Sequence, residues 1–482
     1  MALALTMGIT GCGVADAAAV GDGTAGAHSA GDRLFPGLGN GGYDARSYDV
    51  HFDYRTGTKK MTAASTMRAV ATQDLSSLSL DSAAQKIRAV AVNGETAGFH
   101  TSAKKEKLVI TPDRPLRAGS PFRVTVRYTA DRGKDPVSPA YHLPGNAKWP
   151  VKSWVNTKDG FAFMGQPDRS HLFFPNNDVP GDKARLTFRI TTPDGVRAVA
   201  NGDQASHRAV GGGRQEFTYR TRAPIPTHVS QVAVGRFSGT TRRGPGGLPI
   251  RSYVAAGLNN ANAKKLVGRT PAHVAWLEKT LGLRYPFERY GVLGVNSTYD
   301  GVALETATMS TFSGLGFAKM TAKQEEPIMV HELTHQYFGD AVSVHSWDDM
   351  WLSEGHATYY QMRYSAARGW SGLARAMHST YKAAKKQRAD SGPPGRLKNA
   401  VSLLFDTDAA GAVMLYGLRH KVGDDTFRAI EKTFFTAYRD RSASTQDYID
   451  VANRVSGQNL TPYFHAWLYG KQSPKVPGHP NW

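Results

Sequence analysis

Two histidines and a glutamate, spaced so that they can share one metal ion, form the most informative pattern in the sequence. His331 and His335 stand four residues apart, so on a helix both imidazoles lie on one face, about one turn apart. Glu354 follows in Trp351-Leu352-Ser353-Glu354, on what we predict to be the next helix. Two imidazoles and a carboxylate bind zinc and leave a coordination position open for water and substrate. We therefore predict one zinc ion (Zn2+), held by His331, His335 and Glu354.

The residue after the first histidine completes a hydrolytic pattern. Glu332 lies beside the first metal ligand, where a carboxylate can take a proton from a water molecule on the metal. The alternative is a helix-surface glutamate between two surface histidines. A chance His-Glu-x-x-His match is uncommon even in a chain with 16 histidines, and Glu354 in its Trp-Leu-x-Glu-Gly context makes chance less plausible. We predict that Glu332 is the catalytic acid and base.

Length and charge bound the other possibilities. A chain of 482 residues is too long for one ordinary core, so we expect two domains or three. The net charge is +19, but the basic residues are scattered, with no long basic block and no basic array interleaved with aromatic residues. This distribution argues against nucleic-acid binding. Attraction to an anionic cell surface is the simplest purpose for such a charge.

The single cysteine, Cys12, excludes an intrachain disulfide and bears on localisation. It follows a mostly apolar run and Ile9-Thr10-Gly11, which resembles a bacterial lipobox, although no Lys or Arg precedes it. Cleavage after Ala17-Ala18-Ala19 with soluble export is one alternative, and a disordered Ala/Gly arm is another. No apolar run approaches the 18 residues of a membrane span. We expect an extracellular protein, secreted or anchored through lipidated Cys12 to the outer face of the bacterial cell membrane.

The remaining chain divides into a leader and two regions of different secondary structure. Residues 1–31 are predicted to be a signal or lipobox segment with a flexible Gly/Ala-rich leader. Residues 32–235 contain short alternating strands punctuated by turn residues, which predicts an antiparallel β-domain. Helical spacing dominates residues 236–482, which carry the zinc pattern. The fold class is therefore α+β, multidomain.

Helix signals place the metal ligands on two consecutive helices. Thr321-Ala322-Lys323-Gln324 resembles a capping box at the start of the first, and Pro327 is tolerable only near that start. The stretch 386–395 ends in Gly-Pro-Pro-Gly and is predicted to be a loop. The other predicted helices span residues 261–281, 353–367, 410–422, 424–438 and 444–455.

These residues resemble a known family, the gluzincin zinc aminopeptidases of the aminopeptidase N and leukotriene hydrolase type, in a short bacterial form. Besides the zinc motif, several landmarks occur in the family's order, at residues 35–44, 174–183, 285–291 and 302–306. The resemblance implies an N-terminal β-saddle and a thermolysin-like, mostly helical catalytic domain, with the active site in the cleft between them. It also implies peptide substrates with a free N-terminus, and we expect a monomer.

The resemblance also assigns two residues to recognition of the substrate's amino group. Glu305, in Val302-Ala303-Leu304-Glu305-Thr306, matches the family's exopeptidase motif, whose carboxylate pairs with the free α-ammonium of the substrate. Gln166 stands where the family commonly places a second amine-facing residue. Pro167 beside it makes a turn role the competing interpretation.

One departure from the family pattern weakens the expected catalysis. The family's oxyanion-stabilising tyrosine precedes a Gly-Ala pair, here Gly411-Ala412. Aligned without gaps, Asp408 stands at the position of that tyrosine, and with a short deletion the tyrosine is simply absent. Losing one oxyanion donor typically costs on the order of a hundredfold in rate. Tyr416 on the same predicted helix is a possible substitute, and His356 replaces a residue that is usually aromatic. The alternative function is thus a zinc-binding pseudo-peptidase with weak or no turnover.

Overall fold

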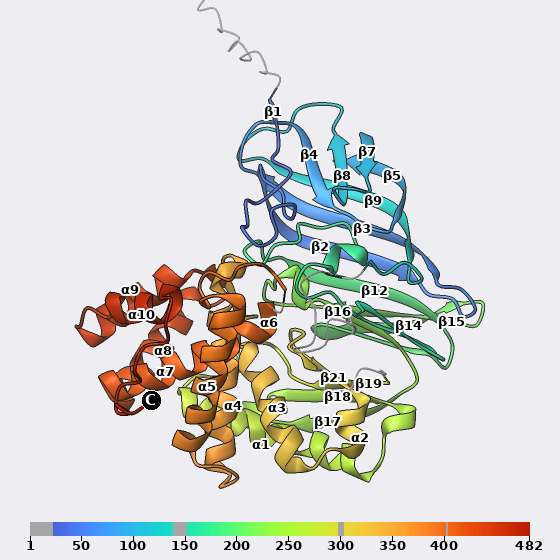
Figure 1. The fold of residues 1–482 in the computed structure, drawn as a ribbon. Coiled ribbons are helices and arrows are strands. Elements are labelled where there is room, and N and C mark those ends of the chain that lie inside the picture. Colours follow the sequence, from blue (N-terminus) through green and yellow to red (C-terminus); the bar gives the residue numbers. More distant parts are fainter. Residues whose placement is uncertain (1–22, 137, 139–151, 297–302, 402) are drawn as a thin grey trace, which may run out of the picture.

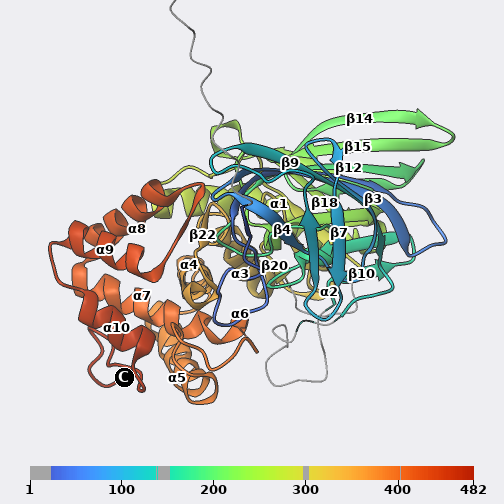
Figure 2. The same cartoon turned by 90° about the horizontal axis from the view of Figure 1, so that it is seen from above.

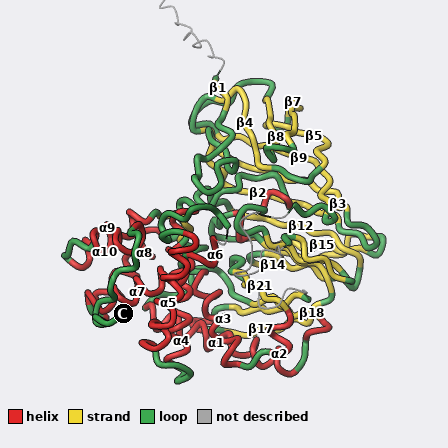
Figure 3. The backbone as a smooth tube through the Cα atoms, viewed as in Figure 1, coloured by secondary structure: helices red, strands yellow, loops and turns green. Residues whose placement is uncertain are grey.

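A β-rich half and a helical half make up the molecule (Figure 1). The computed structural model describes residues 23–136, 138, 152–296, 303–401 and 403–482. Strands fill the N-terminal half of the chain, and most helices gather on the opposite side, around the C-terminal half (Figure 3). This arrangement confirms the predicted fold class. Cys12 and the predicted cleavage site at 17–19 lie outside the described residues.

A large eight-stranded sheet is the main structural element of the N-terminal half. Along its strands buried and exposed residues alternate, as in Lys60–Ala71, where Met61, Ala63 and Met67 face the core and Thr62 and Arg68 face solvent. This period of two is what a sheet with one buried face requires. In spatial order the strands are β14 (Asp203–Gly211), β15 (Arg214–Arg220), β12 (Arg185–Pro193), β2 (Tyr43–Asp53), β3 (Lys60–Ala71), β9 (Pro121–Asp131), β5 (Lys86–Val92) and β6 (Glu95–Thr96).

The prediction of an antiparallel domain is wrong at two pairings, one in the centre of the large sheet and one between Thr24–Ala25 and Leu75–Asp81. β12 runs parallel to β2, with Phe188 opposite Val50. Adjacent antiparallel strands can be joined by a tight hairpin, whereas parallel neighbours need a long connection. The chain between β2 and β12 forms other strands before it returns to pair beside β2, so the sheet is mixed.

Two smaller sheets complete this half. One contains β1 (Thr24–Ala25), β4 (Leu75–Asp81), β8 (Lys107–Thr111) and β7 (Gly98–Ser102). The other contains β10 (Trp154–Thr157), β11 (Gly160–Met164), β16 (Gln231–Gly235) and β13 (Arg197–Ala200). Phe173 lies among the aromatic side chains at the centre of the domain, stacked on Phe52 and Phe163 at 4.2 Å and 4.8 Å between ring centroids.

The predicted flexible leader is wrong at its C-terminal end. Thr24–Ala25 form β1, which pairs with β4, and the Gly26 N–H donates to the Ser77 carbonyl at 2.9 Å. A Cβ on Gly26 would lie 2.7 Å from the Gly41 carbonyl oxygen. The small residues therefore permit close backbone contact here, which composition alone does not distinguish from flexibility.

The C-terminal half combines a five-stranded sheet with packed helices. Its sheet has the order β17 (Phe237–Arg243), β18 (Pro249–Ala255), β19 (Val292–Val295), β21 (Ser310–Ser313) and β20 (Ala303–Leu304), and β22 (Val342–Val344) pairs with β23 (Arg441–Ala443). The helices are α1 (Ala261–Leu281), α2 (Gly314–Lys319), α3 (Ala322–His335), α4 (Trp351–Ala367), α5 (Leu373–Ser391), α6 (Leu403–Asp406), α7 (Asp408–Val422), α8 (Asp424–Tyr438), α9 (Thr445–Ser456) and α10 (Thr461–Tyr469).

Most predicted helices occur within two residues of their expected ends, and the predictions for α1 and α8 match at both ends. Viewed from above, the helices α3 to α10 lie to one side of the large sheet (Figure 2). In the described part of the chain, no helix is both long and apolar enough to cross a bilayer.

Candidate metal centre and amine-binding site

The helix that carries the histidines is fixed at its start and along its buried face. Thr321 and Gln324 form the predicted capping box, which satisfies backbone N–H groups at the start of α3. Met329, Val330 and Leu333 pack into the core. This packing sets the rotation of α3 about its axis and directs the histidines toward α4.

The three predicted ligands converge. The Nε2 atoms of His331 and His335 lie 3.4 Å and 3.5 Å from Glu354 Oε2. One donor atom from each residue falls within 4.8 Å of the other two. α4 brings Glu354 to this point because its first turn packs beside the last turn of α3.

Each imidazole is oriented by a partner that the sequence did not identify. His335 Nδ1 donates to Ser353 Oγ at 2.8 Å, and that hydroxyl donates to the Phe338 carbonyl at 3.2 Å. His331 Nδ1 donates to Gln361 Oε1 at 2.9 Å. Both bonds place the ring proton on Nδ1 and leave the Nε2 lone pair directed at the cluster, as a metal ligand requires.

The electrostatics of the cluster fit a cation. Burial opposes ionisation of Glu354, yet His335 and His331 lower the pKa of that carboxyl to about 2. Burial disfavours the charged form of His335, but Glu305 and Glu354 raise its pKa to about 10. Carboxylates thus surround two imidazoles whose Nδ1 atoms are already hydrogen-bonded to Gln361 and Ser353. The donor set of two nitrogens and one carboxylate oxygen suits zinc.

Glu332 lies beside the cluster without being one of the three predicted ligands, with a carboxylate oxygen within 4.8 Å of a His335 ring nitrogen. Its Oε2 atom is buried and has no hydrogen-bond partner among the described residues. Burial raises the pKa of Glu332 well above its ordinary value, and the neighbouring Glu305 and Glu354 carboxylates raise it further. A carboxylate with a raised pKa that faces the cluster is suited to accept and return a proton.

The two residues predicted to face the substrate amine meet each other. Gln166 Nε2, from the β-domain, donates to Glu305 Oε1 at 2.6 Å, and both side chains are buried. The Gln166 Oε1 atom has no partner within the described part of the chain. A carbonyl oxygen and a carboxylate are therefore available together, beside the metal cluster, to an ammonium group. The Gln166-Pro167 peptide bond is cis.

A buried glutamine ties the Glu305 segment to the metal helix. Gln336 follows His335, donates through Nε2 to the Glu305 carbonyl at 3.0 Å, and accepts from the Thr308 N–H at 2.7 Å. Thr308 has a φ of 67°, a strained value for a β-branched residue. Gln336 thus holds this turn in place and sets the position of Glu305 relative to α3.

The comparisons with known proteins agree with this geometry. The model of the peptidase family M1 domain matches residues 267–467, and that of the peptidase M1 N-terminal domain matches residues 44–229. The chain belongs to peptidase family M1. The two matches cover the helical half that holds the metal cluster and the β-rich half that supplies Gln166. This confirms the predicted family.

Individual M1 proteins are similar over most of the chain. A substrate-bound mutant of the M1 zinc metallopeptidase from Deinococcus radiodurans, crystallised with Tyr-Ser-Ala, superposes with a TM-score of 0.80 at 28% identity, covering 94% of this chain and 100% of that one. Aminopeptidase B of Homo sapiens is 24% identical over 74% of this chain and 54% of its own length. Aminopeptidase 2 of Candida albicans is 20% identical over 81% of this chain and 43% of its own length. The chain thus spans about half the length of these two curated relatives.

Asp408 lies close to the metal centre of this M1 protein. α7 packs on α4 through two glycines, and a Cβ on Gly411 would lie 2.7 Å from the Gly355 Cα. Asp408, one turn before Gly411, therefore lies near Glu354. Burial, followed by the charge of Glu354, raises the pKa of Asp408 to about 7, and its Oδ1 accepts from Gln387 Nε2 at 3.1 Å.

The structure does not support Tyr416 as a substitute for the missing tyrosine. Its hydroxyl is hydrogen-bonded to His479 Nε2 at 2.8 Å, and its ring stacks near Trp482. Eight residues separate it from Asp408, which is about 12 Å along the helix. His356 is likewise structural. Its Nδ1 donates to the Leu352 carbonyl at 2.7 Å, and its ring stacks on Phe338 at 4.2 Å.

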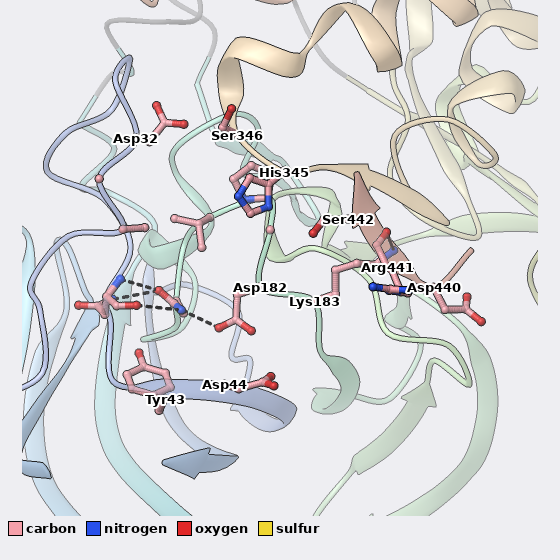
Figure 4. Close-up of a pocket in the computed structure, with 17 residues that line it drawn as sticks. Asp32, Tyr43, Asp44, Asp182, Lys183, His345, Ser346, Asp440, Arg441 and Ser442 are labelled. Carbon is pink, nitrogen blue, oxygen red and sulfur yellow. Dashed lines mark hydrogen bonds between the residues drawn. The ribbon is translucent and has the colours of Figure 1, made fainter. Parts of the chain in front are cut away.

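A cavity of about 580 Å³ lies between the two halves of the molecule, away from the metal cluster (Figure 4). Asp182 and Lys183 line it from the β-domain, and His345 and Asp440 line it from the helical half. Lys183 Nζ donates to two carbonyls just beyond α3, those of Asp340 and Ala341, at 2.7 Å each. This contact fixes the β-domain, and with it Gln166, relative to the metal helix.

Proposed function

We propose that the protein is a zinc-dependent aminopeptidase that removes N-terminal residues from peptides. The observation that carries this proposal is the buried Glu305–Gln166 pair beside the metal cluster, in which Gln166 Oε1 has no hydrogen-bond partner among the described residues. A paired carboxylate and amide oxygen recognise a free α-ammonium group and close one end of the site. The names of the curated relatives, which are aminopeptidases, support the same reading.

His331, His335 and Glu354 would hold one zinc ion. When bound, zinc would polarise a water molecule and the scissile carbonyl. Glu332 accepts the proton of the attacking water and returns it to the leaving amine. Glu305 and Gln166 hold the substrate's ammonium group, so that the first peptide bond lies against Glu332. The pKa of Glu332, raised by burial and its acidic neighbours, suits this exchange.

Localisation and assembly belong to the same proposal. We infer an extracellular monomer acting on peptides, secreted or held at the outer face of the bacterial membrane through lipidated Cys12, and not acting on nucleic acid. The support is the lipobox-like sequence before Cys12 and the absence of a basic array with interleaved aromatic residues.

A second candidate function is a zinc-binding pseudo-peptidase, which the position of Asp408 favours. An ionised carboxylate near the reacting carbonyl would repel the developing oxyanion unless it is protonated. The intact Glu332 and Glu305 favour the enzyme.

Two measurements on the wild type and on Glu332→Gln distinguish the aminopeptidase from the pseudo-peptidase. One is the zinc content, and the other is the rate of hydrolysis of aminoacyl-nitroanilides. We expect one zinc in both proteins and a rate about 10²–10⁴-fold lower in the variant. Equal rates would contradict the aminopeptidase, and zinc binding without turnover in the wild type would establish the pseudo-peptidase.

A further inference from the structure

We infer that the solvent face of the large sheet binds linear polyphosphate, a flexible chain of phosphates. The face is formed by outward side chains of β3, β9 and β5, on the side of the sheet opposite the buried Met67, Val124 and Val126. Five cationic side chains on it are exposed, and we name them the β9 cation cluster: Arg68, Lys86, Arg88, Arg123 and Arg127.

The strand register brings these cations together. Arg68 of β3 stands directly opposite Arg123 of β9, and Arg127 follows on the same face. Lys86 of β5 is opposite Thr129, and Arg88 donates to the Thr129 hydroxyl at 3.3 Å. Adjacent strands lie about 4.8 Å apart, so the charges form one continuous patch across three strands.

The cluster does not serve stability. Like charges directly opposite each other destabilise a sheet, and Arg68 and Arg123 are such a pair. Among the residues that the structure describes, none of the five cations forms an ion pair with a carboxylate. On the other half of the same face, arginines are neutralised, as in Arg189 with Asp49 at 2.8 Å and Arg208 with Glu216 at 2.9 Å.

The chemistry of the cluster selects the partner. Four of its five members are arginines, whose planar guanidinium groups match phosphate oxygens bidentately. The outward positions between them are threonine and alanine, including Thr66, Ala89 and Thr125. Among the described residues, the outward positions of β3, β9 and β5 within this cluster carry no large apolar side chain that could enter a bilayer, and no aromatic ring on which a base could stack. A flexible chain of phosphates is the partner that the face fits.

Linear polyphosphate, used as the defined probe, tests the proposal against the full-length protein. Its dissociation constant is measured by fluorescence anisotropy at a series of NaCl concentrations. Arg68→Gln/Arg123→Gln removes two charges from the cluster, and Arg242→Gln/Arg243→Gln on the exposed end of β17 removes two charges elsewhere. Because counterion release sets the salt dependence, each lost phosphate contact lowers the slope of log K against log[NaCl] by about 0.7.

We expect the cluster variant to bind polyphosphate at least about tenfold more weakly at low salt, with a smaller slope, while the control stays within about threefold of the wild type. Both variants should keep wild-type hydrolysis of a small nitroanilide, because neither pair touches the metal or amine site. Arg68→Gln alone should raise the midpoint of thermal unfolding at low salt.

Three outcomes would overturn the inference. Equal losses in the two double variants would mean that only net charge matters. If the wild type does not bind polyphosphate at low salt, polyphosphate is excluded as the partner of this face. Binding to phosphatidylglycerol vesicles with no binding to polyphosphate would assign the face to a membrane instead.

Discussion

Replacing Ser353 by alanine should weaken zinc binding far more than replacing Gln361 by methionine, although each residue orients one histidine ligand. Ser353 Oγ accepts from His335 Nδ1 at 2.8 Å, and Gln361 Oε1 accepts from His331 Nδ1 at 2.9 Å. The two bonds have similar lengths, so the difference comes from what can replace them.

Exposure decides that difference. The His335 side chain is 1% exposed, whereas that of His331 is 17% exposed. Without Ser353 the His335 N–H is buried and unpaired, a cost of about 1–3 kcal/mol. That range corresponds to roughly 5–150-fold in affinity, in line with the loss of about 10–100-fold typical of removing a residue that orients a metal ligand. Water can replace Gln361 at His331, so we expect a loss of about threefold or less there.

The assay is competition for zinc between each apo-protein and a chromophoric chelator, which reports affinity without depending on turnover. Thermal unfolding of the three apo-proteins serves as the control for folding. Equal losses in Ser353→Ala and Gln361→Met, or no loss in either, would refute the argument from burial.

Three further predictions concern catalysis and stability. Glu305→Gln should lower kcat/KM for a free-amine peptide by about 10–150-fold, because a charged hydrogen bond worth about 1.5–3 kcal/mol is lost; an unchanged value in steady-state kinetics would remove Glu305 from amine recognition. Asp408→Asn should raise kcat, by up to about a hundredfold, because a neutral amide replaces a carboxyl that repels the oxyanion when ionised; a fall in kcat would assign Asp408 a useful role. His171, which bonds Asp178 and Glu106, has its pKa raised to about 10 by these partners despite its burial, so the stability it contributes is complete below about pH 6.5 and is lost as pH rises toward 10. In urea titrations His171→Gln should therefore be less stable than the wild type by an amount that shrinks between pH 6.5 and 10, and a constant difference would contradict this.

The placement of His331, Glu332 and His335 was predictable because their spacing along one helix sets their geometry, whereas Glu354 reaches them from the next helix. The roles of Ser353 and Gln361 in orienting the histidines were not predictable, because their contacts depend on how α3 packs against α4. The contact between Gln166 and Glu305 joins positions far apart in the sequence, and only the family resemblance indicated it.

Two misreadings have a common cause. The composition of residues 24–26 predicts a flexible leader, yet these residues pair with β4 and the small size of Gly26 allows close contact there. The predicted loop at 386–395 began too early, because α5 continues to Ser391. Arg388 extends this helix by donating to the carbonyls of Trp467 and Gly470 at 2.6 Å each. In both places a tertiary contact outweighed local composition.

The most direct test of the account compares one peptide with a free amino terminus and the same peptide acetylated there. In the proposed function the Glu305–Gln166 pair recognises the substrate, and this recognition needs a charged ammonium group. We predict release of the first residue from the free peptide and, for the acetylated one, a kcat/KM lower by at least about 100-fold. Equal cleavage of the two peptides would contradict the proposed aminopeptidase.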